Sequence, residues 1–168
     1  MRLSANALPP PSFTSHNDLA SIKRLWTQLE YYHDDLRGDD HDTLQSIGRR
    51  FAAMMERLQL KPPGYRVMSA IDADGTTVGY GLATLRPGTK QGEIAQLFVV
   101  PSARKRGIGQ QLMTMMLEWL TNNATRTLPI SLHVMGGNDE ALAFYKHIGF
   151  KIVQTDYTLE KPFPSPNK

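Results

Sequence analysis

Two stretches in the first third of the chain carry apolar residues at helical spacing. The first begins at Asn17 or Asp18, either of which is a good helix cap, and runs to about residue 32. Its apolar residues recur three and four positions apart, and they are Leu19, Ile22, Leu25, Trp26 and Leu29. A second pattern of this kind covers about residues 43–58. The sequence therefore predicts two amphipathic helices, joined by a polar loop over residues 34–42.

The pattern then changes to that of β-strands. Strands are predicted over Tyr65–Ile71, Thr76–Leu85 and Glu93–Val100. Between the first two, Asp74-Gly75 is a strong hairpin signal. The third strand ends in a continuous apolar run, Leu97–Val100, which is typical of a strand buried on both faces. We expect these three strands to form a meander.

Helices and strands alternate in the rest of the chain. A glycine-bearing loop leads into a predicted helix over about residues 107–122, and a buried strand follows at 130–134. Asn138 opens a helix that runs to about residue 147. Two short strands, 150–153 and 157–159, close the pattern. With a strand expected before the first helix, this order predicts a mixed α+β fold, a sheet with helices on its faces.

Composition narrows the class of protein. The 168 residues are the length of one domain, and we expect a single domain whose ends, 1–12 and 161–168, are flexible or extended. The absence of cysteine excludes a disulfide framework, a thiolate metal site and a cysteine nucleophile. No signal peptide and no apolar run near ~18 residues is visible, so we expect a cytoplasmic protein without a membrane span. The net charge of +3 is too small to argue for nucleic acid.

The segment between the third predicted strand and the next helix has the features of a phosphate loop. Gly107 and Gly109 would let a pyrophosphate approach the backbone at the start of a helix, where N–H groups are unpaired. The basic run 104–106 adds cations. A Rossmann fingerprint is excluded because its third glycine would fall on Leu112, and the Lys-Ser/Thr end of a P-loop is missing. On the glycines alone, an ordinary glycine turn explains the segment equally well.

A second motif further along the chain resolves this ambiguity. Arg104-x-x-Gly107-x-Gly109, preceded by an apolar strand and a proline, resembles the acetyl-CoA pyrophosphate loop of the GNAT superfamily of N-acetyltransferases. Asn138-x-x-Ala141-x-x-x-Tyr145-x-x-x-Gly149-Phe150 resembles the later motif of the same family, and the best-matched region is 65–160. The resemblance implies a twisted, mostly antiparallel GNAT-like sheet flanked by helices, with the cofactor cleft between its fourth and fifth strands.

The resemblance also implies acetyl-CoA as the acetyl donor and assigns residues to it. Backbone groups of Leu97 and Val99 would pair with the pantetheine arm, and the Leu97 amide would polarise the thioester carbonyl. Asn138 would contact the arm near the second strand of the cleft. The residues expected to bind acetyl-CoA are Leu97, Phe98, Val99, Arg104, Lys105, Arg106, Gly107, Ile108, Gly109, Gln110 and Asn138.

Two residues of the matched region are candidates for proton transfer. In the family, a tyrosine at the position of Tyr145 can protonate the leaving thiolate, and packing of a helix aromatic on the sheet is the alternative. A glutamate at the position of Glu93 takes the proton of the substrate amine in some members, directly or through water. An ordinary exposed residue at a strand start explains Glu93 equally well. No pair of histidines has metal-ligand spacing, so no metal is expected.

The acceptor side of the cleft is predicted from an acidic stretch that runs from Glu30 to Asp42 and follows Trp26. Carboxylates and aromatic rings there would attract a small cationic amine such as an aminoglycoside or a polyamine. A solvated surface loop is the alternative. The residues expected to bind the acceptor are Tyr31, Tyr32, His33, Asp34 and Asp35.

The function that follows from the resemblance is N-acetylation. The chain would move an acetyl group from acetyl-CoA to a primary amine of a small molecule or peptide, by direct attack in a ternary complex. The alternative is a non-catalytic acetyl-CoA-binding regulatory module. A nucleic-acid-binding function ranks last because the sequence has no helix-turn-helix pattern and no basic surface interleaved with aromatics. Dimers are frequent in the family, and the sequence leaves the oligomeric state open.

Overall fold

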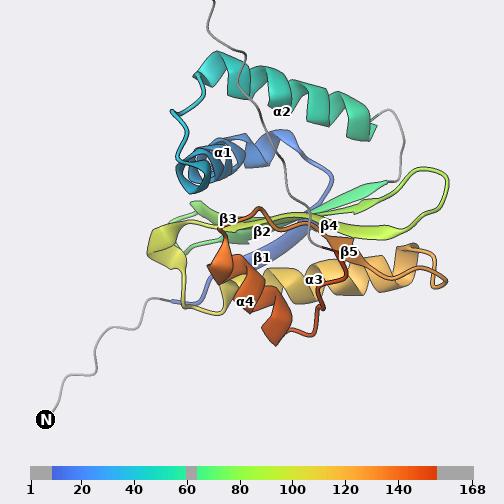
Figure 1. Ribbon diagram of the computed structural model, residues 1–168. Helices are drawn as coiled ribbons and strands as arrows, with labels where there is room; N and C mark the ends of the chain where they lie inside the picture. The colour runs from blue at the N-terminus through green and yellow to red at the C-terminus, as the bar shows by residue number, and fades with distance from the viewer. Residues whose placement is uncertain (1–8, 60–63, 155–168) are drawn as a thin grey trace, which may run out of the picture. The chain divides into compact units, whose positions relative to one another are not determined.

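The computed structural model describes residues 9–59 and 64–154 (Figure 1). The chain divides after Gly137 into two compact units. Of the elements in the described residues, the first unit carries the strands and the helices α1 to α3, and the second carries α4. Of the predicted elements, the strand at 157–159 lies outside the described residues. Within the described ranges, no helix has the length and apolar character needed to cross a membrane.

In the described part of the chain, five strands form one sheet in sequence order. The strands are β1 (Ser12–His16), β2 (Tyr65–Ile71), β3 (Thr77–Leu85), β4 (Gly92–Val99) and β5 (Ser131–Leu132). Strands β1 to β4 pair antiparallel, and β4 pairs parallel with β5. The hairpin predicted at Asp74-Gly75 is confirmed, with Gly75 at a φ of +84° and its N–H on the Asp72 carbonyl. The predicted α+β class and the meander are therefore confirmed.

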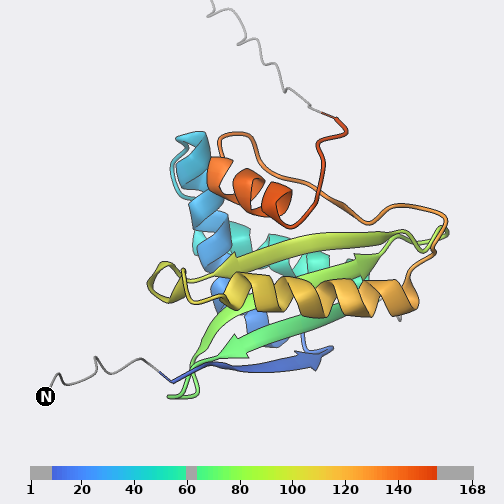
Figure 2. The ribbon, with the colours of Figure 1, turned by 90° about the horizontal axis from the view of Figure 1, so that it is seen from below.

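Helices cover both faces of this sheet. Figure 1 shows α1 (Lys23–Arg37) and α2 (Leu44–Gln59) on one side of the sheet and α3 (Ile108–Asn123) on the other. The core under α1 and α2 contains Trp26, Phe51, Tyr80 and Phe98. Figure 2 shows α3 lying along the opposite face, where Met116 of α3 approaches β3 so closely that a Cβ on Gly81 would lie 2.6 Å from its sulfur. The sheet is therefore covered on both faces, as the apolar pattern predicts.

The first helix is longer than predicted. It starts after a 3₁₀ turn, η1 (Ala20–Ile22), whose first N–H groups are capped by the Asp18 carboxylate. It then continues to Arg37, so the prediction that Asp34 and Asp35 lie in a loop is wrong. Arg37 forms ion pairs with Asp34 one turn earlier and with Asp39, which stabilises the last turn. Gly38 ends the helix with a φ of +71°.

Three strand predictions in the second half of the chain are also corrected. The run Leu97–Val100 is not buried on both faces, because only Phe98 is buried and its neighbours are half-buried. The strand predicted at 130–134 is reduced to Ser131–Leu132, since its pairing with β4 stops there. Residues 150–153 form no strand. In the second unit, the Phe150 N–H instead bonds the Tyr145 carbonyl at 3.0 Å and completes the end of α4 (Asp139–His147).

Candidate active site

A β-bulge in β4 determines the geometry of the sheet around the site. Leu82 of β3 lies opposite Gln96, but the next residue of β3, Ala83, lies opposite Ile94. Ala95 is therefore an extra residue without a partner on β3. A bulge bends a strand and increases its twist. This bend lies next to the last residue of β4 that pairs with β5, which is Ile94.

Beyond the bulge, one edge of β4 faces away from β3. The Val100 N–H bonds the Val78 carbonyl of β3 at 2.9 Å, so alternate peptide groups of β4, including those of Phe98, face β3. The peptide groups of Leu97 and Val99 then face the opposite edge. Among the described residues, no strand pairs with this edge after Ile94. The N–H and C=O of Phe98 face β3, so of the three predicted strand residues only Leu97 and Val99 offer outward backbone groups.

The predicted phosphate loop leads from this edge to the start of α3. After the 3₁₀ turn η2 (Pro101–Ala103), Lys105 and Gly107 both have a positive φ, of 62° and 76°. Gly107 is the N-cap of α3 and provides no side-chain cap. The first-turn N–H groups of Ile108, Gly109 and Gln110 have no acceptor within the helix. Their donors and the positive end of the helix dipole suit an anion.

The three basic side chains of this loop have different surroundings. Arg106 forms two hydrogen bonds with Asp72 of the β2–β3 turn, at 3.0 and 3.1 Å, and holds the pKa of that carboxyl below its ordinary value. The Arg104 Nε donates to the Val99 carbonyl at 3.1 Å, and its guanidinium lies 5.4 Å from the centre of the Tyr32 ring. Lys105 is exposed. Two of the three predicted cations therefore support the loop and the strand edge as well as adding charge.

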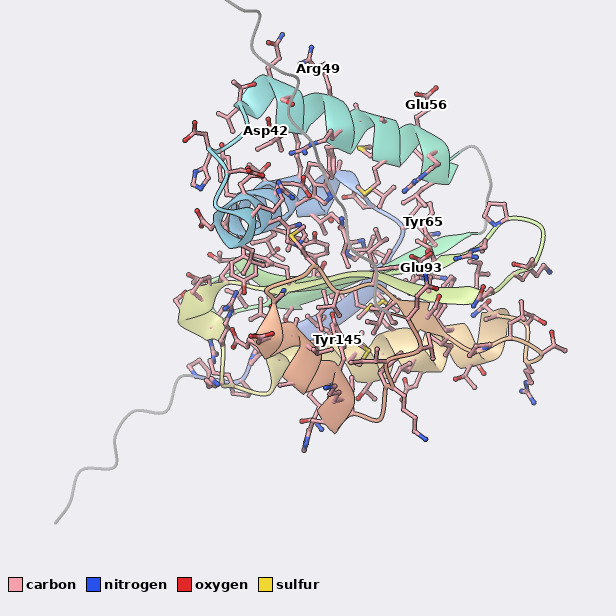
Figure 3. The ribbon with its side chains drawn as sticks, viewed as in Figure 1. Asp42, Arg49, Glu56, Tyr65, Glu93 and Tyr145 are labelled. Atoms are coloured by element: carbon pink, nitrogen blue, oxygen red, sulfur yellow. The ribbon has the colours of Figure 1, made fainter. Side chains whose placement is uncertain are left out.

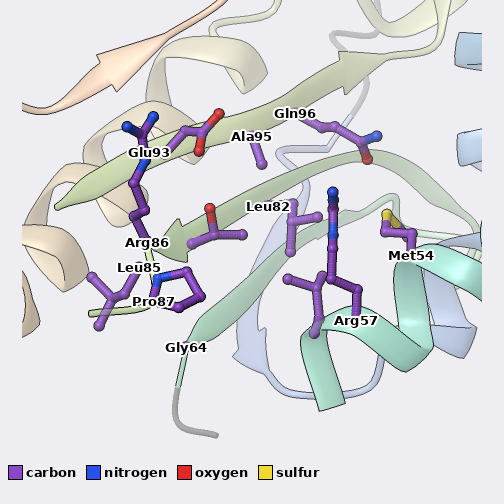
Figure 4. A pocket seen from close by; sticks show the side chains of 12 residues that line it. Met54, Arg57, Gly64, Leu82, Leu85, Arg86, Pro87, Glu93, Ala95 and Gln96 are labelled. Atoms are coloured by element: carbon purple, nitrogen blue, oxygen red, sulfur yellow. The ribbon is translucent and has the colours of Figure 1, made fainter. Parts of the chain in front are cut away.

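A pocket of about 330 Å³ opens on the α2 side of β3 and β4 (Figure 4). Its walls come from the second half of α2, the end of β3 with the following turn, and the bulged part of β4. The side chains of Glu93 and Gln96 reach it from β4. The other lining residues are mostly apolar and include two arginines; they are Met54, Arg57, Leu58, Gly64, Leu82, Thr84, Leu85, Arg86, Pro87 and Ala95.

Glu93 lies in this pocket beside a partner that the sequence did not indicate. Its carboxylate is partly exposed, at 29%, and lies 3.5 Å from Nδ1 of His133. His133 follows β5, which pairs with β4 at Glu93 itself. The short β5 strand thus places an imidazole beside the predicted base.

Gln96 is another residue at the pocket that the sequence pattern did not indicate. The hydroxyl of Tyr80, which is fully buried, donates to Oε1 of Gln96 at 2.8 Å. Burial raises the pKa of Tyr80 well above its ordinary value, so the phenol is a permanent hydrogen-bond donor. The bond orients the Gln96 amide at the wall of the pocket.

The residues predicted to bind the acceptor are mostly engaged within the fold. Asp34 is 2% exposed, pairs with Arg37 and accepts the Asp42 N–H at 3.1 Å. Asp35 contacts His41 at 2.7 Å, and Tyr31 stacks on the same imidazole. Two further carboxylates, those of Glu30 and Asp42, each lie 2.9 Å from Arg50.

His33 also lies in this segment, and it is neutral. Burial lowers its pKa below the ordinary value of 6.5, and the nearby Arg37 lowers it further. Its 3.9 Å contact with Glu30 is therefore not an ion pair at neutral pH. Burial likewise raises the pKa of Glu30 above 4.5.

Asn138 and Tyr145 belong to the second unit of the chain. Asn138 caps α4, because its side-chain oxygen accepts the Ala141 N–H at 3.1 Å, as predicted for a helix start. The Tyr145 ring packs edge-on against Phe144 and Phe150, with centroids 5.4 and 6.1 Å away. Burial raises the pKa of Tyr145 to about 12. The phenol is therefore protonated across the whole physiological range.

Comparisons with known proteins agree with this geometry. The sequence model of the "Acetyltransferase (GNAT) family" matches residues 23–150. The mycothiol acetyltransferase of Corynebacterium jeikeium (strain K411) is 35% identical over 69 residues, which are 41% of this chain and 19% of that protein. The chain thus spans about a fifth of that relative's length.

Solved structures share the fold at low sequence identity. The aminoglycoside N-acetyltransferase AAC(6')-Iy, solved in complex with CoA, has a TM-score of 0.65 and 20% identity over 95% of this chain and 99% of its own. A transcriptional regulator from Bacillus halodurans C-125 has the same TM-score at 16% identity, over 90% of this chain and 99% of its own. The family match covers most of the chain and includes both motifs, so the chain belongs to the GNAT acetyltransferase family.

Proposed function

We propose that the chain is an N-acetyltransferase that moves the acetyl group of acetyl-CoA to a primary amine of a small molecule or peptide. Membership of the GNAT acetyltransferase family supports the acyl-transfer chemistry. The mycothiol and aminoglycoside acetyltransferases that resemble the chain act, by their names, on small molecules. A CoA complex of the latter supports CoA as the carrier.

The observation that carries the proposal is that two groups of open backbone donors, the outward edge of β4 and the first turn of α3, lie at the two ends of residues 97–110. The outward N–H and C=O of Leu97 and the outward N–H of Val99, whose carbonyl already accepts from Arg104, suit the amide groups of a pantetheine arm, which would lie beside β4 as an added strand. The first turn of α3 then offers its N–H groups to a pyrophosphate. Even a Cβ added at Gly107 would have no heavy atom within 4 Å, so the space that an anion would enter there is open.

The chemistry needs two proton transfers, and we assign one residue to each. The amine nitrogen attacks the thioester carbonyl carbon, the carbon–sulfur bond breaks, and the sulfur leaves as a thiolate. Glu93 would take the proton that the amine loses, directly or through a water, because its carboxylate lies in the pocket beside the β4 bulge. Tyr145 would donate a proton or a hydrogen bond to the thiolate, because its phenol remains protonated.

The test is to measure binding and turnover separately. Calorimetry with acetyl-CoA measures the first, and release of free thiol with a panel of amines measures the second. We expect binding together with amine-dependent thiol release. Binding without release for any amine would favour a non-catalytic acetyl-CoA-binding module, and the absence of binding would refute both functions.

A further inference from the structure

We propose that the acceptor is a small amine of amino-acid size that carries a carboxylate and an apolar side chain. Arg57 and Arg86 would hold its carboxylate, and Glu93 would face its amine. The proposal rests on the proposed function, because it names the acceptor of the same site.

The charges of the pocket come from three different elements. Arg57 lies on the second half of α2, Arg86 follows the last residue of β3, and Glu93 lies on β4 (Figure 4). The pocket thus carries two cationic groups and one anionic group. A molecule with one ammonium and one carboxylate matches this arrangement, whereas a polyamine would bring its positive charges to two guanidinium groups.

The side chains of the two arginines do not stabilise the part of the fold that the structure describes. Among the described residues, no carboxylate or carbonyl accepts a hydrogen bond from Arg57 or Arg86. Other arginines of the chain do have such partners: Arg37 and Arg50 pair with carboxylates of the α1–α2 region, and Arg106 pairs with Asp72. A guanidinium group is planar and donates in pairs, which is the geometry that a carboxylate accepts.

The size and the apolar part of the pocket limit the rest of the molecule. Its volume of about 330 Å³ lies at the lower end of the ~300–1,000 Å³ that is usual for ligand pockets. Met54, Leu58 and Leu82 form its apolar wall. A short hydrocarbon side chain would bury there and displace water.

The acidic segment, which suggested a polycationic acceptor, lies at the other end of α2. Figure 3 shows Asp42 beside the start of this helix and Glu56 near its end, and Arg57 is the residue after Glu56. At about 1.5 Å per residue, Asp42 and Arg57 are roughly 20 Å apart along the helix. The carboxylates of Glu30, Asp34, Asp35, Asp39 and Asp42 also have basic partners, either within the segment or at Arg50 in the first half of α2. The acidic segment therefore does not supply the charge of the pocket.

The experiment compares two acceptors that differ only in the carboxylate. L-Leucine and isoamylamine share the same side chain and amine, and spermidine serves as the polycation. We expect kcat/KM to be highest for leucine. We expect Arg57→Gln and Arg86→Gln each to lower the ratio of kcat/KM for leucine to that for isoamylamine by about tenfold, the low end for a hydrogen bond between charged groups at an accessible site. Arg49→Gln is the matched control, since Arg49 is an exposed arginine of the same helix outside the pocket (Figure 3), and its ratio should not change.

The outcomes separate this proposal from the proposed function. Turnover of amines with no preference for leucine, and a ratio that neither pocket variant changes, would overturn the carboxylate assignment and leave the acetyltransferase intact. A preference for spermidine would do the same. If acetyl-CoA binds but no amine is acetylated, the proposed function fails. Calorimetry of leucine with the CoA-saturated protein then tests the pocket alone: binding that Arg57→Gln weakens supports the assignment, and no binding to the wild type overturns it.

Discussion

Replacing Tyr145 with phenylalanine tests whether its hydroxyl acts on the leaving thiolate. The pKa of Tyr145 is raised to about 12 by burial, whereas an ordinary thiol has a pKa of ~8.5. The difference is about 3.5 pH units, and each unit corresponds to ~1.36 kcal/mol. Complete proton transfer from this phenol to a thiolate would therefore be uphill by about 5 kcal/mol.

This difference makes Tyr145 a hydrogen-bond donor in the transition state rather than a full acid. A hydrogen bond to a charged group contributes about 1.5–3 kcal/mol, so Tyr145→Phe should lower kcat by about 10- to 150-fold. The affinity for acetyl-CoA should change little, because the thioester sulfur of the bound substrate carries no charge.

The assay is single-turnover thiol release between pH 6 and pH 10, with calorimetry of acetyl-CoA binding as the control. A phenol with a pKa of about 12 stays protonated over this range. The wild-type and Tyr145→Phe profiles should therefore be parallel, separated by the same factor at each pH. An alkaline fall in the wild type that the Tyr145→Phe variant lacks, with a midpoint below pH 10, would refute the reasoning, and so would an unchanged rate.

Three further changes test other parts of the site and the fold. Glu93→Gln should reduce kcat/KM most at low pH, where more of the amine is protonated and a base matters most; superimposable pH profiles would exclude Glu93 as the base. Gly109→Val should weaken acetyl-CoA binding at least tenfold in calorimetry, because Gly109 lies in the first turn of α3 and a side chain there would obstruct the pyrophosphate. Circular dichroism should show a folded protein, because Gly109 does not have the positive φ that valine would resist, and equal affinity would exclude this turn as the pyrophosphate site. Asp34→Asn should lower the free energy of unfolding by about 2 kcal/mol in urea denaturation because Asp34 is buried and ion-paired, whereas Asp40→Asn, at an exposed position, should change it by less than about 0.5 kcal/mol; equal effects would contradict a structural role for Asp34.

The elements that local sequence signals specify were predicted well. The hairpin at Asp74-Gly75 needs only a residue with positive φ between two alternating runs, and the start of α4 needs only the cap that Asn138 provides. The error at the end of α1 arose because a dense group of aspartates was interpreted as a loop. The three-residue spacing of Asp34 and Arg37, which stabilises a helix end, was present in the sequence as the opposing signal.

The part of the candidate site that a motif can describe is the part that is continuous in the chain. The end of β4 and the loop after it follow one another, so residues 97–110 could be proposed from the motif, and Glu93 could be proposed from its place in the same strand. The pocket is made by side chains that are far apart in sequence. Arg57, Arg86 and Gln96 come together only where the second half of α2, the turn after β3 and the bulged part of β4 surround the pocket, and none of them has a local pattern that distinguishes it from a surface residue.

The bulge at Ala95 shows why the alternation of β4 could not be interpreted from the sequence. In a regular strand, residues three positions apart point to opposite faces. Here Glu93 lies opposite Thr84 and Gln96 lies opposite Leu82, and these two β3 residues are two positions apart on one face. The extra residue therefore turns both Glu93 and Gln96 towards α2, where they line the pocket together and where Gln96 meets the buried hydroxyl of Tyr80. Ala95 also directly follows Ile94, the last residue of β4 that pairs with β5. This one inserted residue therefore shapes the pocket wall on the α2 face of β4 and lies where the pairing of β4 with β5 ends.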